Sequence, residues 1–148
     1  MYQQAFWLGF VTGLRSMLPL ALLAWTSNTT DENSITPQKA LSGLAAVGEI
    51  IGDKLPATPS RLSAGPLIGR LAIGATAGAL LSRRFNQSPV QGAIRGAIGA
   101  ALGSLAGYGY RTFASQLTDV PDVVWALIED GAALGLGTLA VNRPFQER

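Results

Sequence analysis

The chain has 148 residues, of which 48% are hydrophobic and 14% are charged, and its net charge is +2. It contains 18 glycines and neither cysteine nor histidine, which excludes disulfides, thiolate or imidazole metal sites and histidine-based catalysis. The small, scattered positive charge gives no basic surface for nucleic acid. Glycine within apolar runs is typical of packed membrane helices, so we expect an all-α membrane protein with one domain over residues 1–148.

The first expected span covers Gln4 to about Trp25, long enough to cross a hydrocarbon core of about 30 Å. Arg15 lies near its centre, and Pro19 predicts a kink beside this arginine that frees backbone carbonyls for a partner. The residues around Trp25 make a poor signal-peptidase site. We therefore expect the span to be retained.

The second expected helix, Gln38–Gly52, follows a polar surface loop. Its apolar part of about 13 residues is shorter than the roughly 17 that a span needs, so it is either re-entrant or shielded by other helices. Pro56 and Pro59 then predict a rigid extended turn, because residues before proline avoid the α region. In all, the sequence predicts about five transmembrane or re-entrant helices.

Two further spans, Gly65–Leu81 and Val90 to about Phe113, are joined by a short polar link. Their glycines recur at small-xxx-small spacing, as Gly74 with Gly78 and Gly99 with Gly103. This spacing favours close helix crossing. It predicts that the two spans form a close antiparallel hairpin in which these glycine rows face each other.

The fifth span is expected from Pro121 to about Val141, because proline is favoured at the first helical position. Segments Arg70–Gly78 and Arg95–Gly103 are alike, either because Gly/Ala helices look alike by chance or because the chain contains a duplication. With three helices in the first unit, a duplication would produce an inverted internal repeat, as in many transporters.

Five motifs appear in the order GLRSM, GEIIGDKLPATPSR, GPLIGRLAIGA, GYGYRT and PDVVWALIEDGAA. In this they resemble the bacterial membrane proteins catalogued as domain of unknown function 4126, over almost the whole chain. The resemblance implies a small multi-pass protein of the cell inner membrane. It implies no activity, because none is established for that family.

Charged residues interrupt the apolar segments, where an unpaired charge costs about 2.5–3.5 kcal/mol. We expect them to converge in a polar cavity in which acids and arginines neutralise each other, with Glu49 the preferred partner of Arg15 and Glu129 the alternative. Salt bridges that merely fix helix register are the other interpretation of each residue. The candidates for ion or substrate binding are Arg15, Glu49, Asp53, Lys54, Arg61, Arg70, Arg95, Arg111, Glu129 and Asp130.

The function predicted from this pattern is transport or channelling of an ion or small polar solute through the charged site. The alternative is a structural or assembly subunit of a membrane complex that transports nothing. An intramembrane enzyme ranks third, because the sequence shows no catalytic nucleophile or metal constellation. No cofactor is expected. The expected partners are the lipid bilayer and further copies of the chain in a homo-oligomer.

Overall fold

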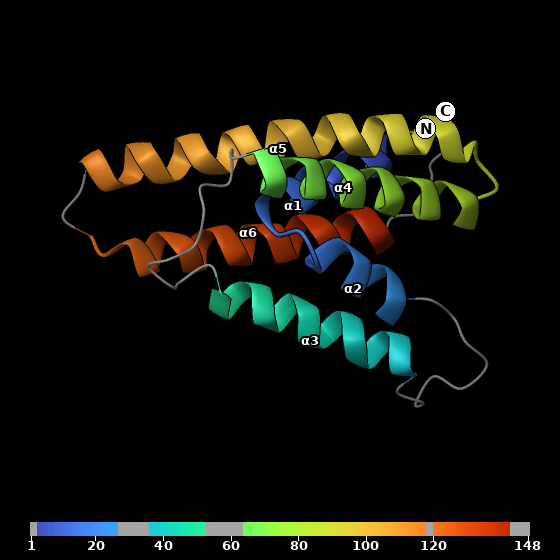
Figure 1. Cartoon of the computed structure of the whole chain (residues 1–148), viewed down its shortest axis with the longest axis horizontal. Helices are drawn as coiled ribbons and strands as arrows, with labels where there is room; N and C mark the ends of the chain where they lie inside the picture. Colours follow the sequence, from blue (N-terminus) through green and yellow to red (C-terminus); the bar gives the residue numbers. More distant parts are fainter. Residues whose placement is uncertain (1–2, 27–35, 53–63, 118–119, 143–148) are drawn as a thin grey trace.

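The computed structural model describes residues 3–26, 36–52, 64–117 and 120–142. Within these ranges the fold is all-helical, as expected from the sequence. Two stretches, Ala64–Arg84 and Val123–Asn142, are long and apolar enough to cross a membrane. The six helices seen in Figure 1 are α1 (Gln3–Leu14), α2 (Leu18–Trp25), α3 (Pro37–Gly52), α4 (Ala64–Arg84), α5 (Pro89–Leu117) and α6 (Asp122–Asn142).

The first segment is not the single span that its length predicts. The chain leaves the helical path at Arg15, α1 and α2 form the two arms of a V-shaped hairpin, and the apex lies inside the bundle (Figure 1). Pro19 sits in the first turn of α2, where a missing backbone N–H is tolerated. Proline therefore starts a new helix here, rather than kinking a continuous one.

Helices α1, α4 and α5 form a core, called here the glycine core, in which backbone lies directly on backbone. A Cβ atom added at Gly74 of α4 would lie 2.7 Å from the Ala100 Cβ and 2.8 Å from the Gly96 carbonyl oxygen of α5. One added at Gly103 of α5 would lie 3.1 Å from the Cα of Gly13 in α1. Only glycine permits such close approach, because any side chain would push the helices apart.

The predicted antiparallel hairpin of α4 and α5 is present, but its glycine rows are paired differently from the prediction. Gly74 and Gly78 face Gly92 and Gly96, while Gly99 and Gly103 face α1. The four glycines of α5 lie on one face, because residues three, four and seven apart are neighbours on a helix, and α4 and α1 meet this stripe at successive points along its length. Helix α5 therefore packs against two partners at once.

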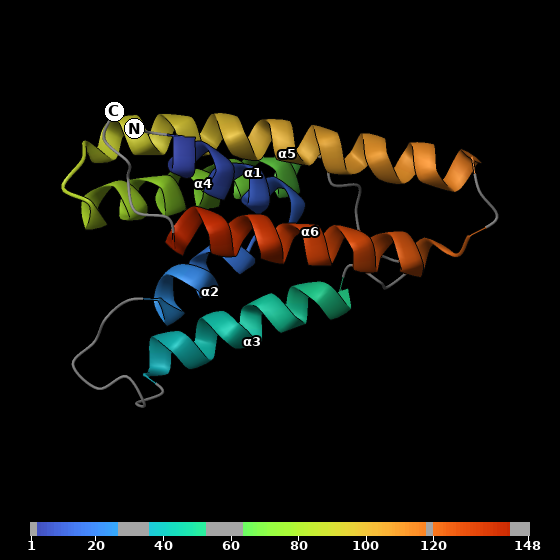
Figure 2. The same ribbon diagram turned by 180° about the vertical axis from the view of Figure 1, so that it is seen from behind.

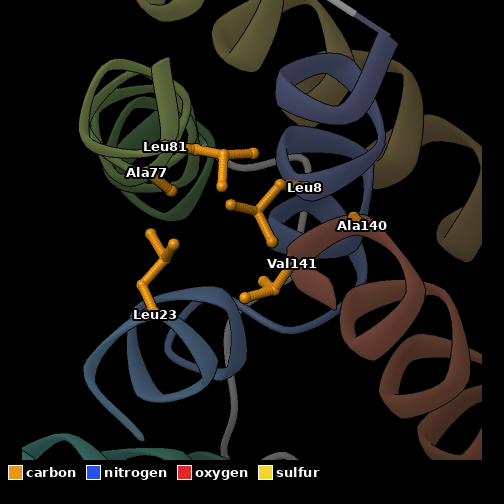
Figure 3. Close-up of a cluster of buried hydrophobic side chains, with 6 residues drawn as sticks. All are labelled: Leu8, Leu23, Ala77, Leu81, Ala140 and Val141. Atoms are coloured by element: carbon orange, nitrogen blue, oxygen red, sulfur yellow. The ribbon is translucent and has the colours of Figure 1, made fainter. Parts of the chain in front are cut away.

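Helices α2 and α6 cover the open side of the glycine core. Figure 3 shows one buried apolar cluster, to which four helices contribute Leu8, Leu23, Ala77, Leu81, Ala140 and Val141. Leu8 belongs to α1 and Leu23 to α2, so the second arm of the hairpin returns to the level of the first. Val11, Leu14 and Leu18 form a second cluster with Ala133 of α6, closer to the apex.

Helix α3 lies at the edge of the bundle, next to α2 and apart from α4 and α5 in both views (Figures 1 and 2). In the described part of the chain, α2 is the one helix against which α3 packs extensively. Gly43 of α3 lies beside the Trp25 ring of α2. Leu41, Leu44 and Val47 of α3 are all exposed.

Candidate functional site

The helix break at residues 15–17 leaves backbone groups that a continuous helix would have paired internally. In such a helix the Met17 N–H would donate to the Gly13 carbonyl. Here the Met17 N–H donates to Glu49 Oε2 at 2.8 Å, and the Ser16 N–H donates to Glu49 Oε1 at 2.6 Å. The Gly13 carbonyl accepts from the Ser104 hydroxyl of α5 at 3.4 Å. Side chains from α3 and α5 thus replace the missing helical hydrogen bonds.

Arg15 ends the first arm of the hairpin and is almost wholly buried, with 2% of its side chain exposed. Its Nε donates to Oδ1 of Asp130 in α6, and the two groups form an ion pair. The structure therefore gives the predicted role of Glu49 to Asp130. The reason is geometric: both oxygens of Glu49 already accept backbone N–H groups of the break.

A second buried arginine reaches the same break from α4. Arg70 is 5% exposed, and its Nε donates to the Ser16 hydroxyl at 3.1 Å. The backbone N–H and the side chain of Ser16 therefore bind Glu49 and Arg70, which come from different helices. The break is the point where α1, α3, α4 and α6 are joined by polar contacts.

The α6 side of this site carries two adjacent acids in different environments. Glu129 is 4% exposed and shares a helix face with Ala126, Ala133 and Gly137, which packs toward α1 and α2. Asp130 lies at the edge of that face, with 16% of its side chain exposed. Successive helical residues point about 100° apart, which explains the difference.

Contacts of the described residues join four of the candidates predicted from the sequence at this charged site, namely Arg15, Glu49, Arg70 and Asp130, and Glu129 is buried next to Asp130. Within the described residues, these contacts bring together two guanidinium groups and two carboxyl groups. Arg95 is exposed on α5 and lies outside this site, and Arg111 is half-buried near the end of α5. Asp53, Lys54 and Arg61 lie outside the described residues.

The sequence analysis missed two polar residues of the site, Ser16 and Ser104. Ser104 is fully buried in the glycine core, where its hydroxyl serves the Gly13 carbonyl. A serine within a Gly/Ala helix carries little signal, because its size alone suits close packing. Ser16 carried a clearer signal, since it lies between Arg15, a charge within an apolar run, and the helix-starting Pro19.

No protein-family model matches the chain, and no similar curated protein or solved structure is found. The resemblance to the family of unknown function therefore stays a prediction. The charged site must be interpreted from its own geometry.

Proposed function

We propose that the chain is a multi-pass protein of the cell inner membrane that passes an ion or small polar solute through the charged site. The observation that carries this proposal is the buried Arg15–Asp130 ion pair at the helix break, in the interior of a bundle with an apolar outer surface. The bilayer, the inner-membrane location and the solute all belong to the proposal.

The distribution of side chains supports a lipid environment. In water-soluble proteins arginine and glutamate side chains are seldom fully buried, and large apolar patches are rarely exposed. Here Arg15, Arg70 and Glu129 are among the buried residues. One face of α5 carries a row of apolar side chains that are 46–67% exposed: Val90, Ile94, Ile98, Leu102 and Leu105. Contact with lipid would avoid the free-energy cost of exposing these apolar side chains to water.

The hairpin supports a pathway rather than a simple span. At about 1.5 Å per residue, α1 is about 18 Å long and α2 about 12 Å, and both are shorter than a hydrocarbon core of about 30 Å. An irregular backbone is tolerated at membrane depth where it is buried in protein or lines a polar cavity. Interrupted helices with polar breaks are how many transporters build their binding sites. The first segment, and not the second, is thus our candidate for re-entry.

The chemistry of the site favours a proton or cation as the exchanging species. A guanidinium group has donors but no acceptor atom, so neither Arg15 nor Arg70 can bind a proton or a cation. The carboxyl group of Asp130 can, and it is the more exposed member of its pair. A cation that reaches Asp130 would compete with Arg15 for the same oxygens. We therefore assign the exchange to Asp130 and the role of internal competitor to Arg15.

Flux measurements in proteoliposomes test the proposal with protons and Na⁺ as probes. Wild-type protein should dissipate an imposed gradient at least about tenfold faster than empty liposomes. Asp130→Asn alone strands a buried charge, so the decisive variant is Arg15→Gln with Asp130→Asn, which removes both charges and should fold. This double variant should lose flux. Thr138→Val, an exposed change on the same helix, should keep it.

Two results would reject the transport proposal. One is a folded double variant that conducts as well as the wild type. The other is wild-type protein that conducts neither probe and instead co-purifies with a stoichiometric membrane partner. That second result would favour the structural or assembly subunit, with the exposed row on α5 as its contact surface.

A further inference from the structure

Helix α3 is attached to the rest of the described protein at two points of different kinds. Near its start, the Trp25 indole N–H donates to the Lys39 carbonyl at 3.2 Å, and Gly43 packs on the same ring. Near its end, Glu49 accepts the two amide groups of the break at 2.6 and 2.8 Å. We call these two hydrogen bonds the Glu49 contact.

The packing between these two points is shallow. Glu49 lies ten residues beyond Lys39, about 15 Å along the helix axis. A Cβ atom added at Gly48 would meet nothing within 4 Å. Ala46 is the one apolar side chain of α3 that is buried among those described. An alanine buries little apolar surface, so the described side chains between Lys39 and Glu49 contribute little apolar packing.

The two hydrogen bonds of the Glu49 contact are strong, but both depend on one carboxylate, so they are lost together. Hydrogen bonds from backbone amides to a carboxylate are roughly twice as strong as neutral ones. Among the described side chains of α3, Glu49 is the one whose hydrogen bonds reach the helix break. A helix pinned at one end and held at the other by a single side chain has a natural hinge, and here the hinge is at Trp25.

We propose that α3 is a gate, held closed by the Glu49 contact and pivoting at Trp25, and that its opening exposes the helix break with the Arg15–Asp130 pair. Glu49 is then a positioning residue rather than a binding residue. This inference rests on the proposed function, because it describes how access to that same site is controlled. It adds a moving element that the sequence did not suggest.

The natural absence of cysteine makes site-directed labelling the direct test. Ala46→Cys places a thiol on the buried face of α3, 8% exposed in the closed state. In full-length protein in liposomes, its rate of reaction with a small maleimide should rise about tenfold or more when Glu49→Gln is added. A tenfold rise corresponds to the loss of about one charge-assisted hydrogen bond.

A matched control separates opening of the gate from general unfolding. Ala77→Cys places a thiol in the fully buried apolar cluster between α1, α2 and α4. Its labelling should stay at the wild-type rate when Glu49→Gln is added. Glu49→Asp is the second variant: it keeps the charge but is one methylene too short, and it should accelerate Ala46→Cys as Glu49→Gln does.

The possible outcomes each decide something. Faster labelling at Ala46→Cys alone supports the gate. Equal acceleration at both positions would mean that Glu49 stabilises the whole fold, and no acceleration at either would mean that α3 is fixed; both overturn the gate. If the labelling result overturns the gate but the wild-type protein still conducts protons or Na⁺, the transport proposal stands. If labelling supports the gate but the wild-type protein conducts neither probe, the transport proposal is rejected and the gate stands.

Discussion

In the glycine core, α1, α4 and α5 are held together by backbone contacts that leave no room for a Cβ atom, whereas α3 is held by a few hydrogen bonds near its two ends. The core contacts extend over whole helix faces and are lost only if the helices separate. Those of α3 depend on single groups, so they can break without disturbing the rest. This difference indicates which part of the protein can move. The charged site lies beside the tightly packed core, and α3 can move away from it.

Enlarging a core glycine should have the largest effect. A Cβ at Gly103 would lie 2.9 Å from the carbonyl carbon of Phe10, so Gly103→Leu must separate α1 from α5. We expect a loss of about 3 kcal/mol or more, at the upper end for overpacked cores. Gly74→Leu and Gly99→Leu should act similarly. Folded yield in mild detergent and the melting temperature measure the effect.

The control for this prediction is Gly135→Leu in α6, where an added Cβ would meet nothing within 4 Å. It introduces the same helix-favouring side chain without a clash, so yield and melting should stay near those of the wild type. Equal losses for Gly103→Leu and Gly135→Leu would show that the close contact does not hold the core together.

Breaking the Arg15–Asp130 ion pair, which joins the helix break to α6, should have a comparably large effect. Arg15→Leu leaves Asp130 without its arginine and should cost about 3–5 kcal/mol, whereas Arg15→Leu with Asp130→Leu should cost less than the single change. Chemical unfolding in detergent gives these free energies. Losses that simply add in this double-mutant cycle would reject the pairing.

The same cycle with Glu49 sharpens the comparison. Glu49 binds backbone amides rather than the Arg15 guanidinium, so the coupling between Arg15→Leu and Glu49→Leu should be clearly smaller than that between Arg15→Leu and Asp130→Leu. A coupling as large as that of Arg15 with Asp130 would restore Glu49 as the partner predicted from the sequence.

The smallest expected effect is at the open end of the α1–α2 hairpin, where Arg84 at the end of α4 contacts Thr26. Arg84 Nη1 donates to the Thr26 hydroxyl at 3.0 Å, and Nη2 donates to the Thr26 carbonyl. Because this contact is exposed, Arg84→Ala should cost about 1 kcal/mol or less, seen as a small drop in melting temperature. Arg83→Ala, exposed next to it, is the control and should cost less still. A loss comparable to that of Arg15→Leu would mean that the hairpin is held mainly at its open end.

The sequence by itself determined the helical segments and the residue types that matter. Helices α4, α5 and α6 begin and end within about one turn of the predicted limits, because apolar runs, proline starts and glycine spacing are local signals. The small-xxx-small pattern correctly indicated close packing of α4 with α5. The low number of charged residues in apolar surroundings made each of them a candidate, and contacts of the described residues place four of the ten at the charged site.

Only the tertiary structure decided the path of the first segment and the pairing of the charged residues. The apolar pattern from Gln4 to Trp25 is compatible both with one continuous helix and with two helices that form a hairpin. Its break is stable because Glu49, more than thirty residues away, supplies acceptors for the freed amides. Arg15 pairs with Asp130, 115 residues away, and this contact depends on how α6 is rotated about its axis. Such choices come from packing between distant segments, which no local pattern contains.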